Sequence, residues 1–224
     1  RSDGPMDRSD PDILTPLQRE VLDTLFTEAA FHRTFYLTGG TALAAFYLFH
    51  RYSDDLDFFT NEDDMAFLWP MLQALQPALR FTVENRQPRF IRLRWAGGLR
   101  LDFVQDVPFR VGVPVAHGAW QVDSVENITL NKITAIQGRL DAKDYVDLYF
   151  LLKKDPSRDI LRLLEAAKKK DASIDPFVWS RVIGDVDTFR VLPRMITPVT
   201  LDELVAFYQS LRRRILIALK PQGL

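Results

Sequence analysis

The stretch from residue 35 to residue 59 reads FYLTGGTALAAFYLFHRYSDDLDFF and decides our interpretation of the chain. A short apolar run ends at Gly39-Gly40, a helix-length apolar segment follows, and Asp55 and Asp57 then lie inside a second apolar run. Side chains alternate between the two faces of a strand, so we expect both carboxylates on one side and Leu56 on the core side. Neighbouring carboxylates repel each other unless a cation lies between them, and Mg²⁺ prefers such oxygen ligands. The pattern predicts a metal-binding strand.

The glycine turn before that strand is a candidate phosphate-binding loop. Glycine lets a backbone approach a phosphate closely, and the first amides of a helix offer donors at the positive end of its dipole. Gly39-Gly40-Thr41 stands just before a predicted helix and has this arrangement. Each feature alone has an ordinary explanation, as a plain turn or as a solvated strand end. The two together, at a helix-length spacing, indicate binding of a metal-complexed phosphate.

Composition places the chain among ordinary globular proteins. Of its 224 residues, 47% are hydrophobic and 26% are charged, and the net charge is -1. No overall basic field favours nucleic acid, so any such surface has to be local. The absence of cysteine excludes disulfides, thiolate zinc sites and a cysteine nucleophile. Apolar stretches are shorter than the ~20 residues that span a bilayer, and residues 1–11 lack the apolar core of a secretory signal, so we expect a cytoplasmic protein without membrane contact.

Periodicity along the chain predicts a mixed α/β portion followed by helices. Thr15-Pro16 is typical of a helix start, with Thr as the N-cap and Pro at the first helical position. We place a boundary at Asp155-Pro156, so that residues 1–155 form the first domain and residues 156–224 the second. Strands are expected at 35–37, 55–59, 90–95 and 99–104, and helices from 16 onward and at 41–49, 65–79, 127–139, 143–153, 157–170 and 201–219.

The two strands at 90–95 and 99–104 form a predicted β-hairpin, because both alternate and Ala-Gly-Gly lies between them. A three-residue loop pairs Leu93 with Leu101, which makes one face wholly apolar. A two-residue loop pairs Leu93 with Asp102 and mixes the faces. Since a slip of one residue inverts every side chain, we prefer the three-residue loop. It predicts Arg92 opposite Asp102 on the polar face.

Two blocks of the sequence resemble the AbiEii/AbiGii-type nucleotidyltransferase toxins, a family of the DNA polymerase β-like nucleotidyltransferase superfamily. The first block joins the glycine turn at 39–41 to residues 50–59, which read HRYSDDLDFF. The second reads NKITAIQGR at 131–139 and KDYVDLY at 143–149. It is similar to the family's lysine-bearing helix and the Arg/Lys-Asp-x-x-Asp-Leu helix that follows.

The resemblance implies an α+β fold: a polymerase β-like nucleotidyltransferase core, with a small mixed sheet flanked by helices, and a helical C-terminal portion. The nucleotide-binding residues that it implies are Gly39, Gly40, Thr41, Arg51, Ser53 and Lys132. The implied ligands of one or two Mg²⁺ ions are Asp55, Asp57 and, from its place on the hairpin, Asp102. The implied catalytic residues are these three carboxylates, Lys132 and the helix carboxylates Asp144 and Asp147, between which the pattern does not choose.

The implied activity is transfer of a nucleotide from an NTP to an acceptor hydroxyl, with release of pyrophosphate. The family makes the 3′ end of tRNA the leading acceptor and an antitoxin protein the neutralising partner in a toxin–antitoxin system. Two alternatives stay open: the same chemistry on a protein or small molecule, and a module that has lost turnover and binds a partner. Simpler interpretations also exist, with Lys132 as a solvated helix lysine and Asp102 as the ion-pair partner of the hairpin arginines.

Overall fold

The computed structural model describes residues 13–62 and 65–220, so residues 1–11, expected to carry no secretory signal, lie outside the described part. The chain divides into two compact units. The first unit comprises Arg1–Phe49 and Ser53–Val125, and the second comprises His50–Tyr52 and Glu126–Leu224. The division falls earlier than the boundary expected at 155/156, because the helices after residue 125 pack with the C-terminal helices. The Tyr208 hydroxyl, for example, donates to the Tyr145 carbonyl at 2.7 Å.

Within the described residues, the first unit holds one mixed sheet with the strand order β3-β4-β5-β2-β1-β7-β6. The central strand β2 runs parallel to β5 and antiparallel to β1, and β1 runs parallel to β7. Mixed sheet and surrounding helices confirm the α+β class. The strands are β1 (Tyr36–Thr38), β2 (Leu56–Thr60), β3 (Thr82–Gln87), β4 (Phe90–Arg94), β5 (Arg100–Gln105), β6 (Val115–His117) and β7 (Trp120–Val122).

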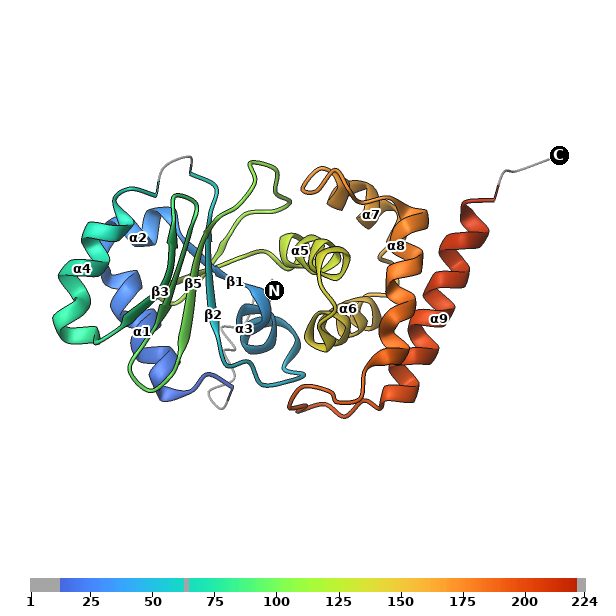
Figure 1. Ribbon diagram of the computed structural model, residues 1–224, viewed down its shortest axis with the longest axis horizontal. Helices are drawn as coiled ribbons and strands as arrows, with labels where there is room; N and C mark the ends of the chain where they lie inside the picture. The colour runs from blue at the N-terminus through green and yellow to red at the C-terminus, as the bar shows by residue number, and fades with distance from the viewer. Residues whose placement is uncertain (1–12, 63–64, 221–224) are drawn as a thin grey trace, which may run out of the picture. The chain divides into compact units, whose positions relative to one another are not determined.

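Helices cover one face of this sheet more fully than the other. Figure 1 shows α1, α2 and α4 on one side and α3 on the other. Aromatic rings of α1 and α2 pack on the first side, where Phe26 of α1 and Phe31 of α2 stand edge-to-face with Phe58 of β2. The opposite side of β2 therefore remains for polar side chains. The helices are α1 (Pro16–Thr27), α2 (Ala29–Thr34), α3 (Gly39–Ala42) and α4 (Leu68–Leu79).

Helix α1 begins where the sequence predicts it. Thr15 is the N-cap, and a capping box joins it to Gln18, whose side chain accepts from the Thr15 amide at 2.9 Å. The helix expected at 41–49 is different in kind: after α3 it continues as a π-helix, η1 (Leu43–Leu48), which ends at Phe49 with φ +54. A π-helix places its side chains at another period, which helical spacing in a sequence does not reveal.

The hairpin register is confirmed. Arg92 pairs with Asp102 and Leu93 with Leu101 across β4 and β5, as the three-residue loop requires. The Trp95 amide donates to the Leu99 carbonyl at 2.8 Å and closes the loop. Leu93 and Leu101 are fully buried, which explains why this register is stable.

The second unit is helical in its described residues. Its centre is Trp179, which is fully buried and whose indole nitrogen donates to the Ile133 carbonyl at 3.2 Å. None of the described helices combines the length and the apolar surface needed to cross a membrane. The helices of this unit are α5 (Val125–Gly138), α6 (Ala142–Lys154), α7 (Ile160–Lys168), α8 (Pro176–Val182), the 3₁₀ segment η2 (Ile183–Thr188) and α9 (Leu201–Ala218).

Candidate active site

Asp57 lies on β2, whereas Asp55, which was expected to begin this strand, immediately precedes it. Burial alternates along the strand, with Leu56 and Phe58 fully buried and Asp57 only partly buried. Asp57 lies in register with Thr38 of β1 on one side and with Asp102 of β5 on the other. Because cross-strand partners share a face, the carboxylates of two adjacent strands stand together there.

The glycine turn lies directly against this face. Gly39 follows β1 with φ +70, a conformation that favours glycine, and a Cβ at this residue would be 2.1 Å from Oδ2 of Asp57. The hydroxyl of Thr41, two residues on, donates to the carbonyl oxygen of Asp55. The turn and the two carboxylates, which are separated by 14 residues or more along the chain, are therefore held together.

Asp102 and Asp55, both candidate metal ligands, form ion pairs. Nε and Nη2 of Arg92 donate to the two carboxylate oxygens of Asp102, each at 2.7 Å, and this hydrogen-bonded pairing raises the pKa of Arg92. Arg100 donates through Nη2 to Asp55. A metal at Asp102 would have to displace a bidentate arginine.

The donor set of Asp55 and Asp57 suits Mg²⁺, which commonly binds one or two carboxylates and completes its shell with water and substrate phosphates. No three carboxylate or imidazole groups of the described residues are gathered so that they alone could hold a metal ion. A metal on β2 would therefore rely on substrate oxygens. This is the arrangement of nucleotide-processing sites rather than of a closed protein cage.

A buried carboxylate that was not predicted from the sequence holds the residue that precedes the glycine turn. Asp123 is fully buried after β7, and it accepts from the Thr38 hydroxyl at 2.7 Å and from Nη2 of Arg110 at 2.8 Å. Thr38 is the residue that precedes Gly39. The only sequence signal was an acidic residue directly after a short strand, which is ordinary turn chemistry.

The second unit holds a separate cluster of charges around Asp147. This carboxylate is fully buried and accepts from Nε and Nη2 of Arg51 at 2.6 and 2.8 Å. Nζ of Lys132 lies 2.6 Å from it, and Nε2 of His50 lies 2.7 Å from it. Lys132 also donates to Asp144 at 2.8 Å. The structure thus brings Lys132 together with both helix carboxylates and with the arginine expected at phosphate.

Burial and charge act against each other in this cluster. Burial alone would raise the pKa of Asp147, but Lys132 and Arg51 hold that pKa well below its usual range. Burial would lower the pKa of Lys132, whereas Asp147 and Asp144 raise it. Burial wins at His50, whose pKa is lowered despite its carboxylate partner. At neutral pH the cluster contains two carboxylates and a charged lysine and arginine beside a neutral imidazole.

The remaining predicted residues have structural contacts. The carbonyl of Ser53 accepts from Nε2 of Gln18 at 2.8 Å, which ties the start of the β2 segment to α1. Gly40 is buried within α3. The predicted residues thus form two groups: the glycine turn, Ser53, Asp55, Asp57 and Asp102 belong to the first unit, and Arg51, Lys132, Asp144 and Asp147 belong to the second.

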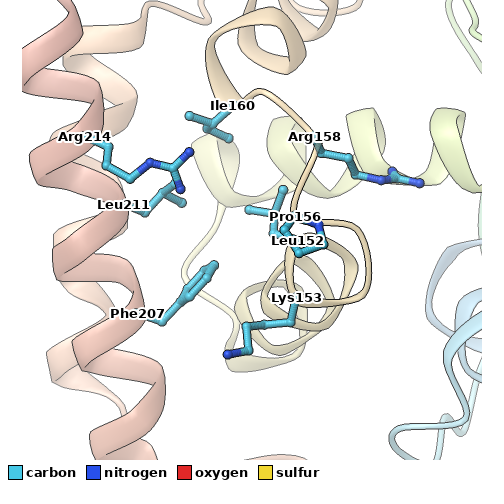
Figure 2. Close-up of a pocket in the computed structure, with 8 residues that line it drawn as sticks. All are labelled: Leu152, Lys153, Pro156, Arg158, Ile160, Phe207, Leu211 and Arg214. Carbon is cyan, nitrogen blue, oxygen red and sulfur yellow. The ribbon is translucent and has the colours of Figure 1, made fainter.

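A cavity of about 260 Å³ lies in the second unit, between the end of α6, the start of α7 and α9. Figure 2 shows Phe207 and Leu211 of α9 facing it, Lys153 and Arg214 at its edges, and the guanidinium of Arg158 directed away from it. The eight lining residues include no carboxylate, so this cavity is unsuited to a metal ion.

Three comparisons with known proteins bear on this site. The family model described as nucleotidyl transferase AbiEii toxin, type IV TA system, matches residues 20–218. An uncharacterized protein of Aquifex aeolicus (strain VF5), aq_aa25, is 29% identical over 171 residues, which cover 70% of this chain and 76% of that protein.

Solved structures show the same fold at low sequence identity. JHP933 from Helicobacter pylori superimposes with a TM-score of 0.53 and 22% identity, over 90% of this chain and 91% of that one. MenT4, the nucleotidyltransferase toxin Rv2826c from Mycobacterium tuberculosis H37Rv, gives a TM-score of 0.50 and 16% identity, over 92% and 84% of the two chains. The family match spans most of the chain and both compact units, so the chain belongs to the AbiEii family of nucleotidyl transferase toxins of type IV toxin–antitoxin systems.

Proposed function

We propose that this chain transfers a nucleoside monophosphate from an NTP to an acceptor hydroxyl and releases pyrophosphate. One observation carries the proposal: the Gly39 backbone lies against the carboxylate of Asp57, so a phosphate-binding turn and a metal-binding carboxylate are neighbours. Nucleotidyl transfer needs positioning and neutralisation of charge more than covalent help from the protein. A glycine turn and adjacent carboxylates supply both.

The proposed roles follow the chemistry of each group. Backbone amides of Gly39, Gly40 and Thr41 hold the triphosphate, with Ser53 nearby in the sequence as a further polar contact. Asp55 and Asp57 hold one or two Mg²⁺ ions, which neutralise the developing charge on the transferred phosphoryl group and orient the acceptor and leaving oxygens. Asp102 acts on the metal only if Arg92 releases it, so we assign it to positioning Arg92.

Lys132 is proposed to neutralise phosphate charge, the role that the family resemblance implies. Its side chain is 8% exposed, and two fully buried carboxylates, Asp144 and Asp147, hold its ammonium group at 2.8 and 2.6 Å. Such anchoring fixes the position of a flexible lysine and keeps it protonated. Arg51 contributes by holding Asp147 rather than by direct phosphate contact.

The acceptor that we propose is the 3′ end of tRNA, with growth arrest as the consequence and a separate antitoxin protein as the neutralising partner in the cytoplasm. Membership of a toxin family supports this choice. The net charge of -1 gives no general affinity for RNA, so contacts would come from local arginines such as those on β4 and β5.

The test is transfer of label from each α-³²P-labelled NTP to RNA in a lysate, with Mg²⁺ present. We expect label on tRNA, and a loss of at least ~100-fold in Asp57→Asn. Asp187→Asn, which changes an exposed carboxylate of η2, serves as the matched control and should label normally. Label on a protein or small molecule instead of RNA would replace the acceptor, and equal labelling by Asp57→Asn would overturn the assigned chemistry.

A further inference from the structure

Arg100 stands out among the arginines of the sheet because its partner is a proposed metal ligand. It begins β5 and donates to the carboxylate of Asp55, which lies two residues before Asp57 in the sequence. Its Nε is buried and makes no hydrogen bond within the described structure, and this nitrogen is 3.9 Å from the nearer oxygen of Asp102. A guanidinium has donors on three nitrogens, so this one is incompletely satisfied.

The other two arginines of the hairpin have different partners. Arg92 is bound through two nitrogens to Asp102. Arg94 pairs with Glu84 of β3 and donates to the Gly98 carbonyl at 3.1 Å. If Asp55 binds a cation, Arg100 loses its hydrogen-bonded partner and keeps only the 3.9 Å ion pair with Asp102.

The charge balance of this face points the same way. Three arginines face four carboxylates there, the four being Asp55, Asp57, Glu84 and Asp102. The charges of these seven side chains sum to one net negative charge, which disfavours a triphosphate, whereas one bound divalent cation makes the same sum net positive. Triphosphate binding should therefore depend on the cation.

We propose that Arg100 is a phosphate-binding residue. Its ion pair with Asp55 keeps it from binding phosphate until a divalent cation binds. Asp55 then exchanges its ion pair with Arg100 for the cation, and the released guanidinium, with its unused Nε–H, binds the nucleotide triphosphate. The exchange makes and breaks no covalent bond. It imposes an order in which cation precedes nucleotide, and it rests on the proposed nucleotidyltransferase function.

Two binding measurements on the full chain test this exchange. Free Mn²⁺ is followed by electron paramagnetic resonance while metal-free protein is titrated without nucleotide. Binding of an α,β-methylene NTP analogue is measured by calorimetry at saturating Mg²⁺. The test variant is Arg100→Gln, and the matched control is Arg94→Gln, which removes the arginine directly across the hairpin from Arg100.

Opposite changes are expected from the test variant. Arg100→Gln should bind Mn²⁺ several-fold more tightly, because Asp55 has lost the competing cation, and should bind the analogue about tenfold more weakly, because one charge-assisted contact is gone. Arg94→Gln should leave both affinities within about twofold. Far-ultraviolet circular dichroism of each variant checks that it is folded.

Parallel changes overturn the inference: if Arg100→Gln weakens both ligands, the residue is structural, and if it changes neither, it is a surface arginine. If Arg94→Gln changed the Mn²⁺ and analogue affinities as much as Arg100→Gln does, the arginines would act as a general basic surface, and Asp55 would not exchange Arg100 for the cation. If the unchanged protein binds neither Mn²⁺ nor the analogue, the proposed function itself fails and the inference with it.

Discussion

Gly39 and Asp57 are in contact in the folded chain: a Cβ added to Gly39 would lie 2.1 Å from Oδ2 and 2.9 Å from Cγ of the carboxylate. Such a distance is far inside van der Waals contact, so any side chain at residue 39 must displace Asp57. The turn also has φ +70 there, which strains every residue that has a Cβ. Both facts make Gly39 a requirement of the site rather than of the turn alone.

Substitution Gly39→Ala should lower labelling of the acceptor by ~100-fold or more, because it displaces Asp57, a proposed metal ligand, by about an ångström. The matched control is Gly98→Ala in the hairpin loop. Gly98 has φ +88, so it shares the backbone strain, but a Cβ there meets no atom within 4 Å. We expect Gly98→Ala to lose ~1–3 kcal/mol of unfolding free energy from backbone strain, Gly39→Ala to lose more because the clash adds to this strain, and only Gly39→Ala to lose activity. Equal activity of the two would contradict the role of the contact.

Asp102 and Asp57 should respond differently to the same substitution. Asp57→Asn is expected to weaken Mn²⁺ binding by ~10-fold or more, since it removes a ligand charge. Asp102→Asn should leave Mn²⁺ affinity within ~3-fold, because both of its oxygens already bind Arg92. Titration of metal-free protein measures both. An equal loss in the two variants would restore Asp102 as a metal ligand, the assignment that family resemblance implied.

Removal of the Asp147 charge should destabilise the second unit. Asp147→Asn leaves Arg51 and Lys132 buried without their shared carboxylate, and breaking one partner of a buried ion pair costs ~3–5 kcal/mol of unfolding free energy. Urea denaturation monitored by Trp fluorescence measures it. Asp187→Asn, at an exposed position of the same unit, should change stability little. If both variants unfold at the same urea concentration, the cluster contributes nothing to the fold.

The buried imidazole of His50 should make the free energy of unfolding depend on pH. Burial lowers its pKa from 6.5, so the unfolded chain takes up a proton at a higher pH than the folded one. The contribution of His50 to stability is therefore complete above pH 6.5 and is lost as pH falls from 6.5 toward the lower folded pKa, by up to ~1.4 kcal/mol per pH unit.

Unfolding free energies at several pH values below 7 measure this loss. His50→Gln should flatten the pH dependence in that window. A His50 ring that titrates at or above pH 6.5 in the NMR spectrum of the folded protein would refute the prediction.

The amino-acid sequence was sufficient to predict those local features for which a single structural rule allows only one arrangement. The hairpin register followed from apolar pairs such as Leu93 with Leu101, because any slip would expose them. The burial of Leu56 and Phe58 on either side of the less buried Asp57 followed from strand alternation. The start of α1 followed from its capping residues.

Other parts could not be predicted because they depend on contacts between distant segments. Nothing local to Asp102 says that Arg92 takes both of its oxygens rather than a metal. Nothing local to Lys132 says that it is buried between two carboxylates, since its helix also fits a solvated surface. The strands β6 and β7 are three residues each, which is too short for an alternating pattern to be recognised. Because these strands could not be predicted, the hydrogen bond from Thr38 to Asp123 after β7 could not be predicted either.

The assignment of His50–Tyr52 to the second unit means that the polypeptide passes from one unit to the other three times. A fragment that starts at residue 126 would therefore lack the guanidinium that neutralises Asp147 and would keep a desolvated acid with one fewer counter-ion. The helical half is consequently not a detachable module.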